Sequence, residues 1–133
     1  MDGDPVGFTC QAFAALSLEP PLVLLAPAKS STSWPRIAQA GAFCVNILAA
    51  HQGGLARTFS VSGADKFAGV EWRPGPVTSS PVLPDALAWV ECRLEAIYDS
   101  GDHELVTGRV LALDVTEREP LLYFRGGFGG FSA

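Results

Sequence analysis

Apolar and charged positions alternate most regularly between Ala86 and Tyr98. Apolar residues of this segment fall on one side of an extended chain and charged residues on the other: Val90, Cys92, Leu94 and Ala96 against Glu91, Arg93 and Glu95. A period of two with one charged face predicts a half-buried antiparallel strand. The turn-forming residues 99–102 follow, and Leu105 to Val115 is again apolar, which predicts a β-hairpin.

Shorter apolar runs predict further strands. Val6 to Ala15 is mostly apolar and predicts a buried strand, which Pro20 and Pro21 separate from a second strand over Leu22 to Ala26. Phe43 to Leu48 predicts a third strand. Pro120 to Phe124 predicts a last strand, followed by a glycine-rich tail.

Two short helices are predicted between these strands. The first has three candidate N-cap residues, a proline for its first turn and a glycine for its end: Ser31, Thr32, Ser33, Pro35 and Gly41. The second spans Gln52 to Phe59, where two apolar residues are four positions apart. Ser62 to Ser80 is irregular and predicts a long surface loop. About six strands and two helices predict an antiparallel barrel with helices at its rim.

Composition narrows the class of protein. The 133 residues predict one domain over 1–133, and 48% hydrophobic against 17% charged residues excludes a disordered chain. A net charge of −5 without a basic cluster argues against nucleic acid and anionic membranes as partners. No apolar run approaches the ~20 residues of a membrane span. The acidic start shows no signal peptide, and Cys10, Cys44 and Cys92 are widely spaced, which predicts reduced thiols in the cytoplasm.

The polar turn Lys29 to Thr32 is the strongest local signal for chemistry. It follows a buried strand and precedes a helix, so free backbone N–H groups, hydroxyls and an ammonium could bind a phosphate there. The alternative is an ordinary helix cap with a solvated lysine. Phe13 and Trp34 flank this turn and would either enclose a planar ligand or belong to the core. Lys66, in the long loop, would meet an anion or solvent.

Several familiar signatures are absent from the sequence. It has no glycine-rich dinucleotide fingerprint before a helix, no Walker A sequence, no Gly-x-Ser-x-Gly elbow and no metal-ligand spacing. We therefore predict no catalytic dyad and no metal site. His103, which directly follows the hairpin turn, is the usual type of surface histidine unless a ligand binds beside it.

Taken in order, several segments resemble the short-chain flavin reductases, and together they span nearly the whole chain. The resemblance is closest to the reductase components of two-component flavin monooxygenases, especially the actinobacterial type that serves steroid-ring hydroxylation. The matching segments are residues 7–23, Lys29 to Trp34, Phe43 to Leu48, Asp65 to Gly69, Gly101-Asp102-His103 and Leu121 to Gly127.

This resemblance implies a mainly β fold, the antiparallel, Greek-key-like FMN-binding split barrel, with short rim helices. It implies a homodimer that transfers a hydride from NADH or NADPH to FMN or FAD and supplies reduced flavin to a partner oxygenase. The two cofactors would carry the chemistry, and the protein would supply their geometry. This division explains why no catalytic residue is predicted.

The resemblance also implies a role for individual residues. The isoalloxazine ring would lie along Gln11, Ala12, Phe13, Ala14, Ala15, Leu16 and Ser17. The ribityl phosphate would be held by Ala28, Lys29, Ser30, Ser31 and Thr32, helped by Lys66, and Phe67 would lie near the flavin edge. The nicotinamide would dock at His103, with Tyr123 and Arg125 nearby.

The sequence departs from the family in two respects. Many relatives carry Asn and Ser in place of Gln11 and Ala12, and a hydroxyl residue in place of Ala14 or Ala15, so fewer side chains would bind the ring. Relatives also have about 30 residues before the position of Asp4, a length consistent with a helix and a strand. The resemblance leaves open a barrel without those elements, whose open sheet edge would lower stability or be covered in the dimer. A flavin-binding module without turnover is the alternative function.

Overall fold

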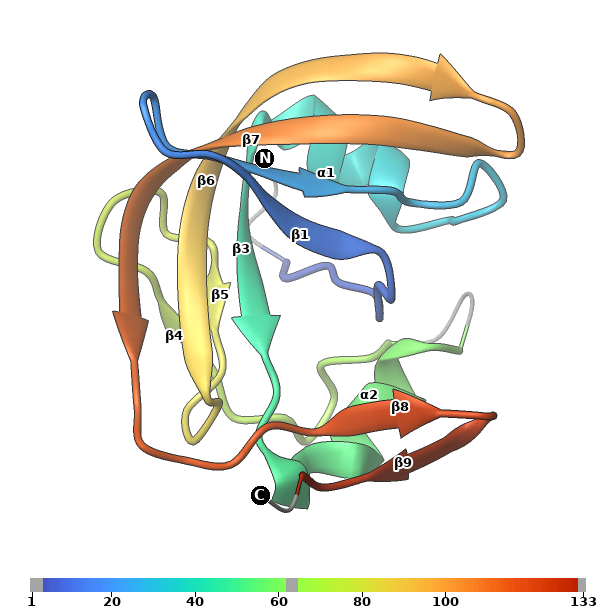
Figure 1. The fold of residues 1–133 in the computed structure, drawn as a ribbon, viewed down its shortest axis with the longest axis vertical. Helices are drawn as coiled ribbons and strands as arrows, with labels where there is room; N and C mark the ends of the chain where they lie inside the picture. Colours follow the sequence, from blue (N-terminus) through green and yellow to red (C-terminus); the bar gives the residue numbers. More distant parts are fainter. Residues whose placement is uncertain (1–3, 62–64, 132–133) are drawn as a thin grey trace.

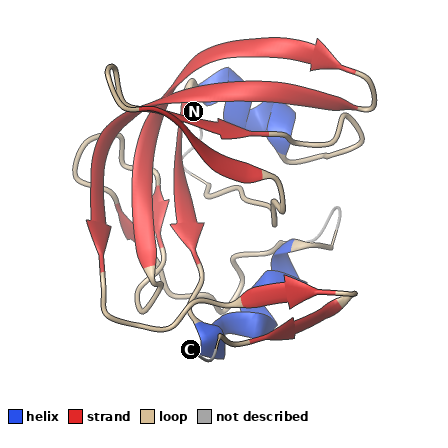
Figure 2. Cartoon of the chain, in the orientation of Figure 1, coloured by secondary structure: helices blue, strands red, loops and turns tan. Residues whose placement is uncertain are grey.

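The computed structural model describes residues 4–61 and 65–131 (Figure 1). Within these ranges the chain is built mainly of strands, with two short α-helices and one 3-10 helix (Figure 2). In chain order the elements are β1 Phe13–Ser17, β2 Leu22–Leu25, α1 Trp34–Ala40, β3 Ala42–Ile47, η1 Ala50–Gln52, α2 Gly53–Phe59, β4 Arg73–Pro74, β5 Pro81–Val82, β6 Ala88–Ser100, β7 His103–Val115, β8 Leu122–Phe124 and β9 Gly127–Gly129.

A five-stranded antiparallel sheet with the order β1-β2-β7-β6-β3 forms the body of the molecule. β6 and β7 form a long, strongly curved hairpin in the middle of this sheet (Figure 1). β2 pairs with the first half of β7, and Phe13, Leu25 and Val106 lie in one row across three strands. The small hairpins β4–β5 and β8–β9 are separate from this sheet.

The core lies between the concave side of the sheet and α1. Trp34 is 3% exposed and makes edge-to-face contacts with Phe8 and Phe43, at 6.5 and 6.3 Å between ring centroids. Such pairs add to the stabilisation that burial of the rings already provides. Trp34 is therefore a core residue, and Phe13 packs against the same cluster.

The predicted helices and the central hairpin are confirmed. α1 begins after Ser33, carries Pro35 in its first turn and ends at Gly41, whose φ of 78° is the left-handed conformation that glycine adopts without strain. α2 begins at Gly53, directly after η1. No helix within the described residues is long and apolar enough to cross a membrane.

Three predictions of local structure are wrong. The buried strand over Val6 to Ala15 is replaced by irregular chain and by β1, an edge strand whose three middle residues are all exposed, so neither of its faces is covered there. The glycine-rich tail forms β9, which pairs with β8. Asp99 and Ser100, predicted in the turn, belong to β6, which leaves a two-residue connection.

The burial of Glu91 differs most clearly from the prediction. It lies on the charged face of β6, but it is 0% exposed because the loop between β4 and β5 crosses this face. Its carboxylate accepts hydrogen bonds from the N–H groups of Val77 and Thr78, at 3.1 and 2.8 Å, and from the Thr78 hydroxyl at 2.6 Å. A buried carboxylate needs such partners, since burial without them is very costly.

Candidate functional site

Backbone hydrogen bonds bring three of the predicted segments together at one end of the sheet. The N–H of Ala26, at the end of β2, donates to the Ala12 carbonyl at 3.1 Å, next to β1. On the other side, the Lys29 N–H donates to the Asp102 carbonyl at 2.9 Å, and Ala28 forms an isolated β-bridge with His103. The predicted ring, phosphate and nicotinamide segments are therefore neighbours across adjacent strands.

The segment predicted to contact the flavin ring is a strip of exposed backbone. Within 11–17, only Phe13 and Ser17 are half-buried, and the remaining residues are exposed. The side chains of Ala14 and Ala15 are small, so a planar group can approach the main chain of this edge strand. A bulge at Leu16 interrupts the pairing of β1 with β2.

The turn that contains Lys29 lies against the β6–β7 hairpin. The Lys29 ammonium makes an ion pair with the Asp99 carboxylate, so this side chain points toward the hairpin. The Ser31 hydroxyl accepts a hydrogen bond from the Trp34 N–H, the first N–H of α1, at 3.1 Å. The predicted phosphate turn is thus partly occupied by contacts within the protein.

A polar cavity of about 610 Å³ lies beside this turn. Lys66, which is 8% exposed, lines it, and the Lys66 ammonium donates a hydrogen bond to the Ser33 hydroxyl at 3.2 Å. Burial lowers the pKa of Lys66 because the charged form loses solvation. Thr32 lines the same cavity, so the structure brings together two of the predicted phosphate residues.

Sequence analysis missed two residues of this cavity as ligand contacts. Ser33 was identified only as a helix cap, and Arg36 was not identified at all, yet both line the cavity with Lys66. Ser33 is the N-cap residue of α1 and Arg36 lies three positions later in its first turn, so the two side chains are neighbours on one side of the helix. That spacing, together with the polar turn before it, is the signal that could have identified Arg36.

Phe67 forms the wall between this polar cavity and a larger apolar one, and it lines both. Its ring makes edge-to-face contacts with Phe59 at 4.8 Å and with Trp72 at 6.2 Å between centroids. The ring also packs so closely on Gly7 that a side chain there would meet Phe59 and Phe67 at 3.2 to 3.3 Å. Phe67 is therefore held rigidly beside the cavity that Lys66 lines.

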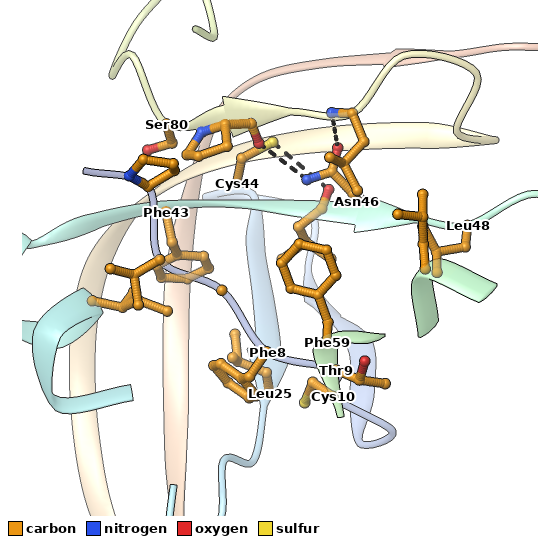
Figure 3. Close-up of a pocket in the computed structure, with 18 of the residues that line it drawn as sticks. Phe8, Thr9, Cys10, Leu25, Phe43, Cys44, Asn46, Leu48, Phe59 and Ser80 are labelled. Carbon is orange, nitrogen blue, oxygen red and sulfur yellow. Dashed lines mark hydrogen bonds between the residues drawn. The ribbon is translucent and has the colours of Figure 1, made fainter. Parts of the chain in front are cut away.

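The larger cavity has a volume of about 1330 Å³ and runs along β3. Figure 3 shows Phe43 and Phe59 pointing into it, whereas Asn46 points away and bonds with the backbone of β5 and the residue that follows it. Gln11 and Phe13, from the predicted ring segment, also line this cavity. It offers an apolar wall beside the polar cavity.

His103 begins β7 at the hairpin turn, and its imidazole Nδ1 lies 2.6 Å from the Asp102 carboxylate. The hydrogen bond with His103, followed by its charge, lowers the pKa of Asp102. Both side chains reach solvent, so His103 is accessible to a ligand that binds at this end of the sheet.

Tyr123 and Arg125 lie elsewhere. They belong to the β8–β9 hairpin, which Figure 1 shows at the bottom of the molecule, whereas the β6–β7 turn is at the top. Tyr123 packs edge-on against Phe128 at 5.3 Å, and the Arg57 guanidinium of α2 lies 5.7 Å from the centroid of the Phe128 ring. Within one chain, the structure does not bring Tyr123 or Arg125 to His103.

Comparison with known proteins identifies the family. The family model described as "Flavin reductase like domain" matches residues 1–132. This chain belongs to that family. It is 50% identical over 130 residues to the reductase subunit HsaB of a flavin-dependent monooxygenase from Rhodococcus jostii, a match that covers 97% of this chain and 66% of the relative. The chain thus spans about two thirds of the length of that relative.

Solved structures of flavin reductase-like proteins share the fold. Component B of a nitrilotriacetate monooxygenase homologue from Mycobacterium thermoresistibile superposes with a TM-score of 0.93 at 46% identity, covering 98% of this chain and 74% of that one. A Streptomyces globisporus NADH:FAD oxidoreductase, solved with NAD and FAD fragments, gives 0.92 at 33% identity, covering 98% and 79%. The predicted family and the mainly β split-barrel fold are confirmed, and the functions named for these relatives agree with the predicted flavin reductase class.

Proposed function

We propose that this flavin reductase-like protein is an NAD(P)H:flavin oxidoreductase, which transfers a hydride from NADH or NADPH to FMN or FAD. Membership of the family supports this activity, as do relatives named as flavin reductases and as an NADH-dependent FMN reductase. One observation in this chain carries the proposal. Main-chain hydrogen bonds place the turn at Ala28, the proposed phosphate segment, directly against His103.

The residues present fit a flavin phosphate. The buried Lys66 ammonium and the Ser33 hydroxyl face a polar cavity, and a cation with adjacent hydroxyl donors suits a phosphate group. Thr32 and Arg36 line the same cavity, and so do Asp4 and Asp65, so its two cationic residues, Lys66 and Arg36, face two acidic ones. The exposed backbone of β1 offers N–H and C=O groups to the polar edge of a flavin ring, and its alanines leave room for the ring to approach.

The protein contributes binding and alignment to the reaction. A bound flavin would supply a ring that accepts the hydride, with both electrons of the broken C–H bond, from the nicotinamide. β1 would set the plane of that ring, and Lys66 would fix the far end of the molecule. His103 would hold the nicotinamide at the hairpin turn, on the far side of β2 from β1, so that the two reacting rings are oriented before transfer.

The partners of the reaction follow from the relatives. HsaB is named as the reductase subunit of a flavin-dependent monooxygenase, and another relative as the reductase component of a trigonelline monooxygenase. These names support an oxygenase that receives the reduced flavin from this protein. NAD(P)H as hydride donor and three cysteines without disulfides support a cytoplasmic location.

A homodimer is also part of the proposal. β1 and β3 are the edges of the five-stranded sheet, and apolar side chains are exposed near it, including Leu18 at 91% and Val115 at 62%. Open edges and exposed apolar residues are usually covered in a stable protein. Light scattering of the purified chain should give twice the monomer mass, and a monomer at micromolar concentration would contradict this part of the proposal.

An anaerobic experiment tests the activity. The purified chain is mixed with FMN or FAD and with NADH or NADPH, and the loss of oxidised flavin absorbance is followed. Bleaching that saturates in both reagents supports the reductase. Flavin binding without bleaching by either nicotinamide supports the alternative function, a flavin-binding module.

A further inference from the structure

Glu104 connects the two halves of the proposed site. Its carboxylate accepts a hydrogen bond from the indole N–H of Trp34 at 2.8 Å, across 70 positions of sequence. Its own backbone N–H donates to the Pro27 carbonyl at 3.0 Å. One residue therefore binds the turn before α1 through its main chain and the first residue of α1 through its side chain.

The Glu104–Trp34 contact lies between the two proposed binding regions. Glu104 directly follows His103, the proposed nicotinamide residue, and Trp34 directly follows Ser33, whose hydroxyl bonds to Lys66. Trp34 is 3% exposed and its ring is held by aromatic contacts, so its N–H is a fixed donor. A hydrogen bond to a carboxylate is stronger than one between neutral groups, particularly where both partners are partly buried.

We propose that Glu104 is a positioning residue, which holds the hairpin turn with His103 at a fixed distance from the phosphate cavity by accepting the Trp34 indole N–H. This inference rests on the proposed function, since it assumes a nicotinamide at His103 and a flavin phosphate near Lys66. The side chain of Glu104 itself contacts neither ligand. Its effect would be on the alignment of the two binding regions.

Kinetic measurements on variants test the inference. Glu104→Ala should lower kcat/KM for the nicotinamide about tenfold, with part of the loss in kcat, because the two rings lose their alignment although no reacting group is removed. Glu104→Gln should stay near wild type, since its amide oxygen still accepts the indole N–H. Glu95→Ala is the matched control, because Glu95 lies on the same hairpin and accepts a hydrogen bond from the half-buried Arg109 at 3.0 Å, away from the turn.

A double-mutant cycle shows whether the effect passes through the indole. Trp34→Phe keeps an aromatic ring and removes the donor, so adding Glu104→Ala to Trp34→Phe should not lower kcat/KM further. Additive effects of the two substitutions would overturn the inference, as would a Glu104→Ala enzyme that behaves like Glu95→Ala.

Hydrogen exchange separates this inference from the proposed function. The amides of Lys29 and Glu104 both form bonds between the turn and the hairpin. They should exchange faster in Glu104→Ala than in Glu95→Ala, whether or not the protein reduces flavin. A wild-type chain without reductase activity would overturn the proposed function, and unchanged exchange of these amides would overturn the positioning role.

Discussion

Lys66 and Ser33 are 33 positions apart in sequence, yet the ammonium of one donates to the hydroxyl of the other at 3.2 Å. This contact joins the long loop to the start of α1 and places a buried cation at the wall of a polar cavity. Lys29, the lysine that the sequence pattern favoured, is instead paired with Asp99. The structure therefore distinguishes two lysines that were both predicted to bind the flavin phosphate.

The first prediction follows from this difference. Lys66→Met should weaken FMN binding by about 10- to 100-fold, the usual effect of losing a charge-assisted hydrogen bond. Lys29→Met should change FMN binding by less than about threefold, because Lys29 is occupied by Asp99. Titration of flavin fluorescence measures both, and riboflavin, which lacks the phosphate, should bind the two variants equally. Equal losses of FMN affinity in the two variants would refute the assignment.

The second prediction concerns pH. Burial lowers the pKa of Lys66 from its ordinary value of 10.5, and a bound phosphate would favour the charged form and raise this pKa again. FMN affinity should therefore be complete below the pKa of Lys66 in the free protein and should fall as pH rises through it. In the Lys66→Met variant this fall in FMN affinity should disappear. Any pH effect that comes from ionisation of the flavin itself is the same for both proteins and cancels in the comparison.

The same pKa shift also affects stability in the absence of flavin. Here the effect increases with pH, whereas FMN affinity decreases. Between the lowered pKa and 10.5 the unfolded chain holds more protons at Lys66 than the folded chain. The contribution of Lys66 to the free energy of unfolding therefore increases with pH across this interval. Chemical denaturation of wild type and of Lys66→Met at matched pH values measures this contribution as the difference between the two proteins. A contribution that decreases with pH would show that the cation is stabilised where it lies.

The third prediction concerns His103. His103→Ala should raise KM for the nicotinamide by about tenfold and change the dissociation constant of the flavin by less than about twofold, because the imidazole lies at the hairpin turn and not in the phosphate cavity. Steady-state kinetics and flavin titration give the two values. An unchanged KM would remove His103 from the nicotinamide site.

The fourth prediction concerns the buried carboxylate under the β4–β5 loop. Glu91→Ala leaves the N–H groups of Val77 and Thr78 without their acceptor, whereas the Thr78 hydroxyl keeps Ser80 as a partner, and should lower the free energy of unfolding by about 3 kcal/mol. Gly75→Ala should also destabilise, because its new methyl group would lie 2.4 Å from the Glu91 carboxyl. In a Glu91→Ala background this steric cost should vanish, since the carboxyl is gone. Denaturant unfolding of the four proteins measures this coupling, and additive costs would contradict it.

The fifth prediction uses the turn of the β8–β9 hairpin. Arg125 and Gly126 have φ angles of 51° and 80°, so both central residues of this two-residue turn are left-handed. Asparagine tolerates this conformation well, so Arg125→Asn should keep the hairpin and leave Tm unchanged or higher. If Arg125 contacts the nicotinamide, as the resemblance implies, the variant should raise KM by about threefold or more. A normal KM with a normal Tm would exclude that contact.

The central hairpin could be predicted from sequence because its signal is local. Alternation in β6 and the short turn before His103 define both strands, and Pro35 and Gly41 define α1. The exposed β1 was predicted as buried because an apolar run does not reveal which strand lies at the sheet edge. The strand β9 was missed because glycines carry no side-chain pattern.

The two buried charged residues whose burial was not predicted, Glu91 in the fold and Lys66 in the candidate site, depend on contacts distant in sequence. The burial of Glu91 requires the β4–β5 loop to cross β6, and the burial of Lys66 requires the long loop to reach α1. Neither path is encoded in a short window of residues. The family resemblance supplied Lys66 as a candidate, but only the fold shows Ser33 and Arg36 beside the same cavity.

Two hydrogen bonds join the proposed flavin and nicotinamide regions, one from Ala26 to Ala12 and one from Lys29 to Asp102. Both are between main-chain atoms, and every residue type except proline can donate such a bond. Together with the Glu104–Trp34 contact, these bonds align the proposed flavin and nicotinamide regions, and neither depends on the side chains of 11–15 and 28–32. Substitutions in 11–15 and 28–32 can alter which flavin or nicotinamide is preferred while the two rings keep their relative placement. This architecture tolerates sequence drift at its ligand contacts, and it makes the chain a suitable scaffold for redesigning cofactor preference.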